Sequence, residues 1–386
     1  MLGILKKYNE IFLTGMYCIC ILPFLSIADL HNQLGIIYPA WLVIAMFFFG
    51  CRLLYKISKQ DCTLDKFHWA FLIYQIVVCA TSIYNKTFSW GMLVVSISTS
   101  MLILLMQYDA KKILEGLVVS IIALSLVNFG SVCLNFTKKE VFFIGGKNQL
   151  SMTLIPTIFF IIIYSIHQTG GINKFAICAA LINFMSILLG GSGTGIIVCG
   201  IAILAIIGQQ AFKYKKVLMG LVVGLNIGLI CLSNLWLDSP IWIWITKLLG
   251  KSNSLTGRTD VWQLFLDKLN VNWIFGNGKG AEVFYIDQWG DKRIFNEAHN
   301  IFLEIFSCSG AVGFFIYIFY FCNAFLNLDY KQKEQRYISI AIFIMLINGL
   351  TESINNNIMF ILMVAFAHNC VFEHHAQNSL QVLAKK

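Results

Sequence analysis

The stretch HNIFLEIFSCSGAVGFFIYIFYFCNAF, residues 299–325, decides the fold of this chain. From Ile301 onward it carries a single charged side chain, Glu304, in a run that is otherwise apolar or small. A helix needs roughly 20 predominantly apolar residues to cross the hydrocarbon of a bilayer. The stretch therefore predicts a transmembrane helix that begins just after His299.

The rest of the chain repeats this pattern. Its 386 residues are 58% hydrophobic and 12% charged, whereas a soluble domain carries about 25% charged residues. The composition excludes a soluble enzyme and predicts an all-α polytopic membrane protein with about twelve transmembrane helices. We expect these helices near residues 10–30, 35–55, 66–84, 88–107, 113–135, 148–167, 174–190, 193–210, 216–237, 299–325, 336–351 and 356–373. The break at 190–193 is so short that a re-entrant helix is an alternative there.

Basic residues set the expected orientation, because loops rich in Lys and Arg stay in the cytoplasm. Most of the 28 Lys and Arg residues fall in segments on the side of the N-terminus, which predicts that both termini are cytoplasmic. The net charge of +9 fits contact with the anionic leaflet of the lipid bilayer and implies no nucleic acid partner. The expected organisation is helices 1–9 in residues 1–237, a periplasmic loop module in 238–298, helices 10–12 in 299–373 and a cytoplasmic tail in 374–386.

The twelve cysteines are scattered through apolar runs, without a CxxC pair and without a cluster of Cys and His. We interpret them as small buried thiols rather than bridges or ligands. The outer loop also lacks an Asp-x-Asp cluster that would hold a hard divalent cation. The sequence therefore predicts neither a metal site nor a cofactor.

The loop 238–298 is long for a connection inside a compact fold, and such loops are usually functional. Its first part, residues 240–249, has a Pro at its start and two Trp, which predicts a short interfacial helix. Its end, residues 296–300, brings His299 to the outer mouth of the next span. With an unperturbed pKa near 6.5, a histidine there can accept a proton. A polar cap is the alternative role.

A second helix is expected in the same loop. Arg258, Trp262, Phe265 and Leu269 follow one another at spacings of four, three and four, so they share one face of an amphipathic helix with Arg258 in its first turn. The free N–H groups of a helix start and an Arg fork together suit a phosphate. The alternative for Arg258 is a side chain that merely snorkels to the membrane surface. The alternative for Trp262 is a side chain that anchors the loop in the membrane interface.

Glycines at 276, 278 and 280 follow this helix. They can bring backbone N–H groups close to a ligand, although short Gly-x-Gly patterns are also common turns.

Taken together, these motifs resemble the Wzy/ligase superfamily of polytopic membrane glycosyltransferases, which comprises O-antigen polymerases, O-antigen ligases and relatives. The resemblance covers roughly residues 140–355. It rests on Gly-Lys-Asn148, Thr-Gly-Arg258 with Trp262, the stretch from Ile274 to Gly280, Glu297-Ala-His-Asn300 with Glu304, the stretch from Ser309 to Gly313, and Gly-Leu-Thr-Glu352.

The resemblance implies a metal-independent reaction at the outer face of the bacterial inner membrane, with a glycan on undecaprenyl pyrophosphate as the donor. In this reading Arg258 stabilises the pyrophosphate and His299 is the general base. An Arg that family members usually carry at a mid-chain break is absent from residues 188–195, so Ser192, Thr194 or Lys147 is expected to replace it. The expected substrate-binding residues are Lys147, Asn148, Ser192, Thr194, Trp262, Gly278, Arg293, Glu297, Asn300 and Glu304.

Three functions remain open at this stage. The first is a polymerase that joins lipid-linked oligosaccharide repeats, with a chain-length regulator and a flippase of the same pathway as possible partners. The second is a ligase that passes glycan to the lipid A core. The third is a polysaccharide transporter, which the scarcity of ionisable residues within the spans disfavours, because transporters place their sites near the midplane.

Overall fold

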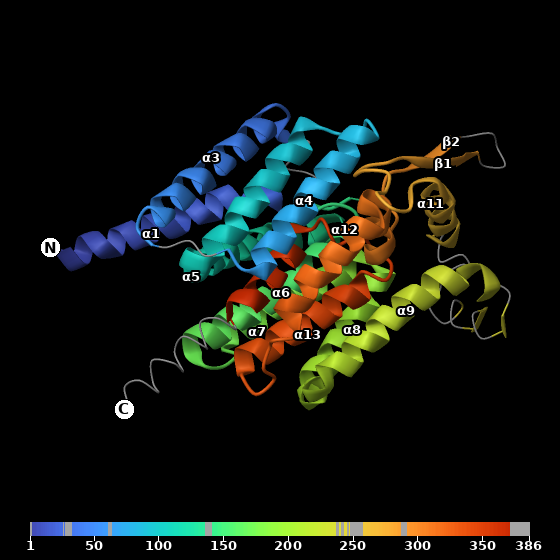
Figure 1. Cartoon of the computed structure of the whole chain (residues 1–386). Coiled ribbons are helices and arrows are strands. Elements are labelled where there is room, and N and C mark those ends of the chain that lie inside the picture. Colours follow the sequence, from blue (N-terminus) through green and yellow to red (C-terminus); the bar gives the residue numbers. More distant parts are fainter. Residues whose placement is uncertain are drawn as a thin grey trace, which may run out of the picture.

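The computed structural model describes residues 2–25, 27, 33–60, 64–135, 141–236, 239–240, 243–244, 247, 258–286 and 292–370. These residues form a bundle of helices with a small module at one end (Figure 1). In chain order the elements are α1 (Leu2–Ile21), η1 (Leu22–Phe24), α3 (Ile37–Ile57), α4 (Lys66–Tyr84), α5 (Trp90–Asn135), α6 (Lys147–Thr169), α7 (Lys174–Gly190), α8 (Gly193–Ile207), η2 (Gln209–Tyr214), α9 (Lys215–Trp236), α11 (Arg258–Asn272), β1 (Val283–Ile286), β2 (Lys292–Phe295), α12 (Ile301–Phe325) and α13 (Lys333–Asn348). A further apolar helix, Ile358–Cys370, follows α13.

Short polar side chains start several helices at the breaks between apolar runs. The Asp65 carboxylate accepts the backbone N–H groups of Phe67 and His68 at the start of α4. Asn173 and Ser192 cap α7 and α8 in the same way. Such caps satisfy donors that a helix start leaves without partners, so the boundaries follow from the polar residues between the runs.

The helix ends lie in two layers. In one layer, which we call the basic end, Asp109 pairs with Arg52 and with Lys56, each at 2.7 Å. In the other layer, the loop end, the segment after α11 lies against the end of α4, where the Ser82 hydroxyl accepts the Lys279 N–H at 2.9 Å. Neighbouring helices such as α4 and α12 therefore run in opposite directions between the two ends.

α5 consists of two helices that meet at Asp109, whose φ of −127° and ψ of 21° interrupt the helical run. Its first half ends at the basic end, where Asp109 is held. Its second half returns to the loop end, where the Ser131 hydroxyl accepts the Phe143 N–H at 3.1 Å. The two runs predicted at 88–107 and 113–135 thus meet directly at a bend.

Five helices in the described part of the chain are long and apolar enough to cross a membrane, namely α3, α4, α5, α6 and α12. The helices Gly193–Ile207 and Gln209–Ile230 satisfy the same criteria only as a pair bent by 90°, which gives at most six. α8 has 15 residues and extends roughly 22 Å, which is less than the thickness of the hydrocarbon. The helices expected at 193–210 and 216–237 are present as this bent pair, and their crossing of the membrane as separate spans stays a prediction. A multi-pass membrane protein is confirmed, and the count of twelve spans stays a prediction.

The break at 190–193 is a turn between two helices. Gly191 ends α7 in the left-handed conformation, with φ of 68°. Ser192 then starts α8, and its hydroxyl accepts the Gly195 N–H at 3.1 Å.

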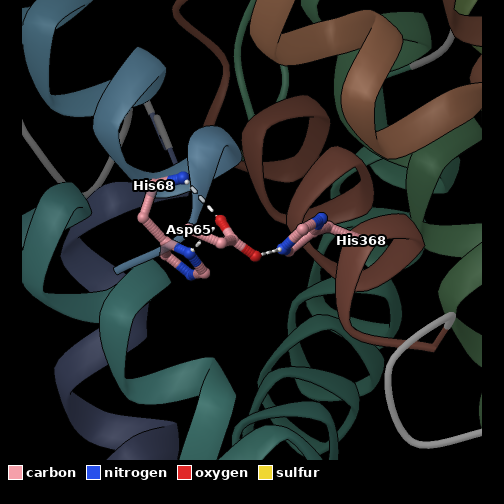
Figure 2. Close-up of side chains that lie close together, drawn as sticks. All are labelled: Asp65, His68 and His368. Atoms are coloured by element: carbon pink, nitrogen blue, oxygen red, sulfur yellow. Dashed lines mark hydrogen bonds and ion pairs between the residues drawn. The ribbon is translucent and has the colours of Figure 1, made fainter. Parts of the chain in front are cut away.

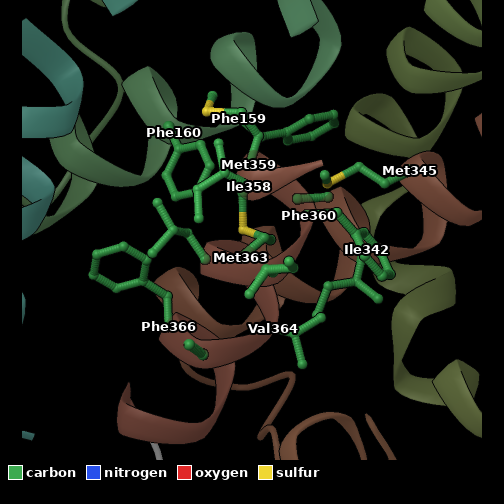
Figure 3. Packing of buried hydrophobic residues seen from close by; sticks show 14 of the residues in the cluster. Phe159, Phe160, Ile342, Met345, Ile358, Met359, Phe360, Met363, Val364 and Phe366 are labelled. Carbon is green, nitrogen blue, oxygen red and sulfur yellow. The ribbon is translucent and has the colours of Figure 1, made fainter. Parts of the chain in front are cut away.

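The helix Ile358–Cys370 is enclosed by the bundle. Phe360, Met363 and Val364 are fully buried, and they pack among side chains of α6 and α13 (Figure 3). A helix that is apolar all round is stable only when other elements surround it. The position of this helix fixes the short polar segment that precedes it, residues 349–357.

The loop module combines α11 with a hairpin. Trp262, Phe265 and Leu269 of α11 form a small core with Val283 of β1 and Leu303 of α12. The amphipathic face predicted for this helix is therefore confirmed. The helix expected at 240–249 lies largely outside the described residues.

The hairpin was not predicted. β1 and β2 are antiparallel, with Val283 opposite Phe295 and Tyr285 opposite Arg293. Aromatic and β-branched residues favour paired strands of this kind, so the all-α prediction is wrong in this detail.

α12 is broken at Gly310, where the loop module meets the bundle. Gly310 has φ of 61° and ψ of −166°, a region that is essentially restricted to glycine. Downstream of the break, the N–H groups of Ala311 and Val312 donate to the carbonyls of Trp273 and Ile274 at 2.9 and 3.1 Å. The break thus lets the backbone of α12 bind the segment that follows α11.

Replacing Gly310 by Ala is expected to destabilise the fold by about 3 kcal/mol or more. The alanine backbone would be held in a strained conformation, and its methyl group would overlap backbone atoms. A Cβ at this position would lie 2.3 Å from the Ile274 carbonyl oxygen. The thermal midpoint of the purified protein measures the effect. Gly200→Ala in α8 is the control, because nothing lies within 4 Å of its Cβ position; equal midpoints for the two variants would contradict the prediction.

Candidate active site

Three ionisable side chains from separate parts of the chain converge at the loop end. Arg258 is the first residue of α11, His299 precedes α12, and Glu352 belongs to segment 349–357. The Arg258 Nη2 forms an ion pair with the Glu352 Oε1, and the His299 Nδ1 lies 3.9 Å from the Glu352 Oε2. Arg258 and Glu352 are 11% and 3% exposed, whereas the His299 side chain is 35% exposed. The ion pair is therefore buried, and the histidine opens to the outside.

His299 is held in an unusual backbone conformation, with φ of 51°. Positive φ is uncommon for residues other than glycine. The neighbouring Ala298 N–H donates to the Glu304 Oε2 at 2.7 Å, and Glu304 is buried in the first turn of α12. Glu304 therefore fixes the backbone that carries His299.

Asn300 joins the elements around the site. Its side-chain oxygen accepts the N–H groups of Phe302 and Leu303 and so caps α12. Its Nδ2 donates to the Asn226 Oδ1 of α9 and to the Leu350 carbonyl oxygen, both at 3.0 Å. All of these bonds are internal to the fold, so Asn300 is a structural residue and its predicted role in substrate binding does not fit this geometry.

The surroundings of His299 favour its neutral form. Burial lowers the pKa of the imidazole below its ordinary 6.5, and the nearby positive charge of Arg258 lowers it further. The His299 Nδ1 and the Arg258 Nε are both buried without a hydrogen-bond partner. A neutral imidazole can accept a proton at neutral pH, and a buried guanidinium N–H can still donate to a bound anion.

The polar residues next to Glu352 strengthen this picture. The Thr351 Oγ1, the Ser353 Oγ and the Asn348 Oδ1 are buried and have no hydrogen-bond partner. Buried polar atoms in folded proteins nearly always have partners, so a group of exceptions calls for an explanation. A ligand rich in hydroxyl groups, such as a sugar, would satisfy them.

The residues expected to replace the missing Arg lie at two helix starts. Lys147 is exposed and Asn148 is half-buried in the first turn of α6, and Thr194 is half-buried in the first turn of α8. Ser192 is fully buried, and its hydroxyl is used as the N-cap of α8. Ser192 therefore does not fit a direct role in binding, whereas the roles of Lys147, Asn148 and Thr194 stay predictions.

The glycine-rich turn is structural. The N–H of Gly278 donates to the Cys308 carbonyl oxygen at 3.1 Å, and the N–H of Asn277 donates to the Ser307 carbonyl oxygen at 2.7 Å. A Cβ on Gly278 would lie 2.8 Å from the Ser82 Cα. The turn thus packs its backbone against α4 and α12, which differs from the expected cradle for a substrate.

Of the remaining predicted residues, two are buried and two are exposed. Trp262 is fully buried in the core of the loop module, so it does not stack on sugars. Glu304 is buried and binds the Ala298 N–H, which makes it a positioning residue. Arg293 in β2 and Glu297 before α12 are both exposed, and their roles stay predictions.

Glu352 was missing from the predicted site residues. Its one sequence signal was the resemblance of Gly-Leu-Thr-Glu352 to a late acidic position of the superfamily.

The comparison with protein families gives one match. The family model described as O-antigen ligase (Wzy_C) matches residues 178–318, a range that includes Arg258 and His299. A search of the curated proteins finds no match. The members of the matched family are membrane enzymes of the glycosyltransferase type, both ligases and polymerases. This multi-pass membrane protein is thus similar, over residues 178–318, to the Wzy/O-antigen ligase superfamily.

Proposed function

We propose that this protein is a polymerase of O-antigen or a related surface polysaccharide. It joins oligosaccharide repeats linked to undecaprenyl pyrophosphate at the periplasmic face of the inner membrane, by a metal-independent and inverting glycosyl transfer. The observation that supports this most is the buried pair of Arg258 and Glu352 beside a half-exposed His299. The cluster supplies a cation for a leaving phosphate and a base for an attacking hydroxyl.

Arg258 stabilises the leaving group. When the bond between the anomeric carbon and the pyrophosphate oxygen breaks, its electron pair stays on that oxygen, so negative charge develops there. Glu352 occupies the Nη2 of Arg258, whereas the buried Nε has no partner. A pyrophosphate oxygen at Nε would complete the hydrogen bonds of the guanidinium and receive its charge.

His299 accepts the proton of the acceptor hydroxyl. The hydroxyl oxygen forms the new bond to the anomeric carbon on the face opposite the pyrophosphate, which inverts that centre, and its proton passes to the imidazole. The lowered pKa keeps His299 neutral and ready to accept. Glu352, 3.9 Å from Nδ1, then stabilises the imidazolium electrostatically.

Two features bear on the choice between polymerase and ligase. The turn at residues 190–193 carries Gly191 and Ser192 where a ligase would usually present an Arg, and this favours a polymerase. The description of the matched family favours a ligase, which is the second candidate function.

Deletion of the gene tests the choice in the native strain. A polymerase deletion leaves lipopolysaccharide capped by a single repeat and removes the ladder of longer chains on a gel. Expression of the wild-type protein, but not of His299→Ala, is expected to restore the ladder. Bare core together with full-length glycan on undecaprenyl pyrophosphate would identify a ligase and overturn the proposal.

A further inference from the structure

The basic end of the bundle holds a second cluster of ionisable side chains, remote from Arg258 and His299. Asp65 and His68 lie at the start of α4, and His368 lies in the last turn of the helix Ile358–Cys370 (Figure 2). α4 is 19 residues long, so roughly 28 Å separates this cluster from the loop end. The site described above does not use it.

The three side chains bring two imidazoles onto one carboxylate. The His68 Nδ1 lies 2.8 Å from the Asp65 Oδ1, and the His368 Nε2 lies 2.7 Å from the Asp65 Oδ2. One potential ligand atom from each residue lies within 4.8 Å of the other two. Among the described residues, these three are the one group of His, Cys, Asp or Glu side chains whose potential ligand atoms lie this close together.

We propose that Asp65, His68 and His368 bind a zinc ion. Imidazole nitrogen and carboxylate oxygen are preferred zinc ligands. Two ligands of a tetrahedral zinc stand roughly 3.3 Å apart, given metal–ligand distances of about 2.0–2.1 Å. The His368 Nε2 must therefore move from the Oδ2 by about half an ångström, and ligand atoms that now lie as much as 4.8 Å apart must close to the same spacing. Rotation of the side chains supplies both movements.

The carboxylate is suited to this role because its two oxygens differ. The Oδ1 also accepts the N–H groups of Phe67 and His68 as the cap of α4, so it is committed to the helix. The Oδ2 faces His368 and is the oxygen available to an ion.

The neighbours of both histidines orient the rings as neighbours of metal ligands commonly do. The Gln107 amide nitrogen lies 2.8 Å from the His68 Nε2; with the amide turned by about 180°, its oxygen accepts the Nε2 proton and leaves the Nδ1 lone pair to face the cluster. Phe67 stacks on the His368 ring at 4.1 Å between centroids. The two histidines are 2% and 7% exposed and Asp65 is 33% exposed. Water can therefore reach the cluster on the Asp65 side, and it would supply a fourth ligand.

A zinc ion here would join the start of α4 to the end of the enclosed helix Ile358–Cys370. It acts on stability rather than on the glycosyl transfer, because the reaction site lies at the opposite end. The test therefore measures metal content and thermal stability of the full chain purified in detergent.

Wild-type protein exposed to zinc chloride and then desalted is expected to retain one zinc per chain by elemental analysis. Zinc is also expected to raise its thermal midpoint by about 2 °C or more relative to chelator-treated protein. His68→Gln and His368→Gln should lose both effects, because a glutamine N–H still donates to Asp65 but is a poor zinc ligand. His167→Gln is the matched control, since His167 also pairs with an acid, Glu334, at 3.5 Å.

Two results would overturn the proposal. The first is wild-type protein that keeps less than about one tenth of a zinc ion per chain and shows no shift in its thermal midpoint. Asp65, His68 and His368 would then be a hydrogen-bonded cluster without a metal. The second is retention of zinc by both glutamine variants at the wild-type level. The wild-type measurement alone decides the question if a variant fails to fold.

Discussion

Replacing His299 by Ala is expected to lower product formation by roughly a hundredfold or more, the scale of a lost acid or base. The side chain lies at the half-exposed edge of the ion pair between Arg258 and Glu352, where it alone of the three is open to an incoming acceptor. Its removal leaves the cap of α12 by Asn300 intact, so the protein should still insert and fold. Synthesis of polymer from lipid-linked donor by the purified variant measures the effect.

The pH dependence gives a second readout of the same residue. Burial and the charge of Arg258 lower the pKa of His299, so the neutral base persists below the pH at which a free histidine protonates. The rate is therefore expected to stay constant as pH falls through 6.5 and to decrease only below it. His167→Gln, at the basic end, should leave both rate and profile unchanged. Near-normal polymer from well-folded His299→Ala would remove His299 from the mechanism.

Arg258→Lys is expected to behave much more like Arg258→Ala than like the wild type. A lysine retains the charge but has no fork, so it cannot hold Glu352 on one nitrogen and a pyrophosphate oxygen on another. In Arg258→Ala the loss of the buried pair also leaves Glu352 uncompensated, which costs about 3–5 kcal/mol when one partner of a buried ion pair is removed; the shorter reach of lysine to Glu352 is expected to cost less. Both activity and thermal midpoint should therefore fall.

Two comparisons separate these effects. Arg336→Lys, in the first turn of α13 at the basic end, is the matched control and should change neither quantity. In Arg258→Ala combined with Glu352→Gln the unpaired carboxylate is gone, so stability should recover in part while activity stays low. Full activity of Arg258→Lys would show that a point charge suffices and that two-point binding is wrong.

The part of the fold that could be predicted best from the sequence was the position of the helices, which follows from local patterns of apolar and polar residues. The apolar runs and the polar residues between them gave the helix positions, and the spacing of Trp262, Phe265 and Leu269 gave the buried face of α11. The hairpin of β1 and β2 was missed because two strands of four residues each are too short for a periodic signal. The 90° bend after α8 was also missed, because the composition of two successive apolar runs does not indicate the angle between their helices.

The site was harder to predict, because its geometry depends on contacts between distant residues. Arg258 and His299 stood out through their local settings, but Glu352 lies 94 residues from Arg258. His368 lies 303 residues from Asp65, so the sequence did not indicate that Asp65, His68 and His368 form a cluster. Conversely, the glycine pattern around Gly278 suggested backbone N–H groups that face a ligand, but the Gly278 N–H donates to the Cys308 carbonyl of α12. Sequence patterns indicate which groups are present, and only the fold determines which of them are already engaged.

The long separation of Arg258 from Glu352 has a consequence for biogenesis. A chain grows at about 5–20 residues per second, so the 94 residues between them take roughly 5–19 s to synthesise. During that interval the arginine has no carboxylate partner, and the backbone of α12 that binds the module is still being inserted. The reactive centre therefore assembles only after the helices that follow it in the chain. Under the proposed function, a truncated protein that ends before Glu352 is therefore expected to be inactive.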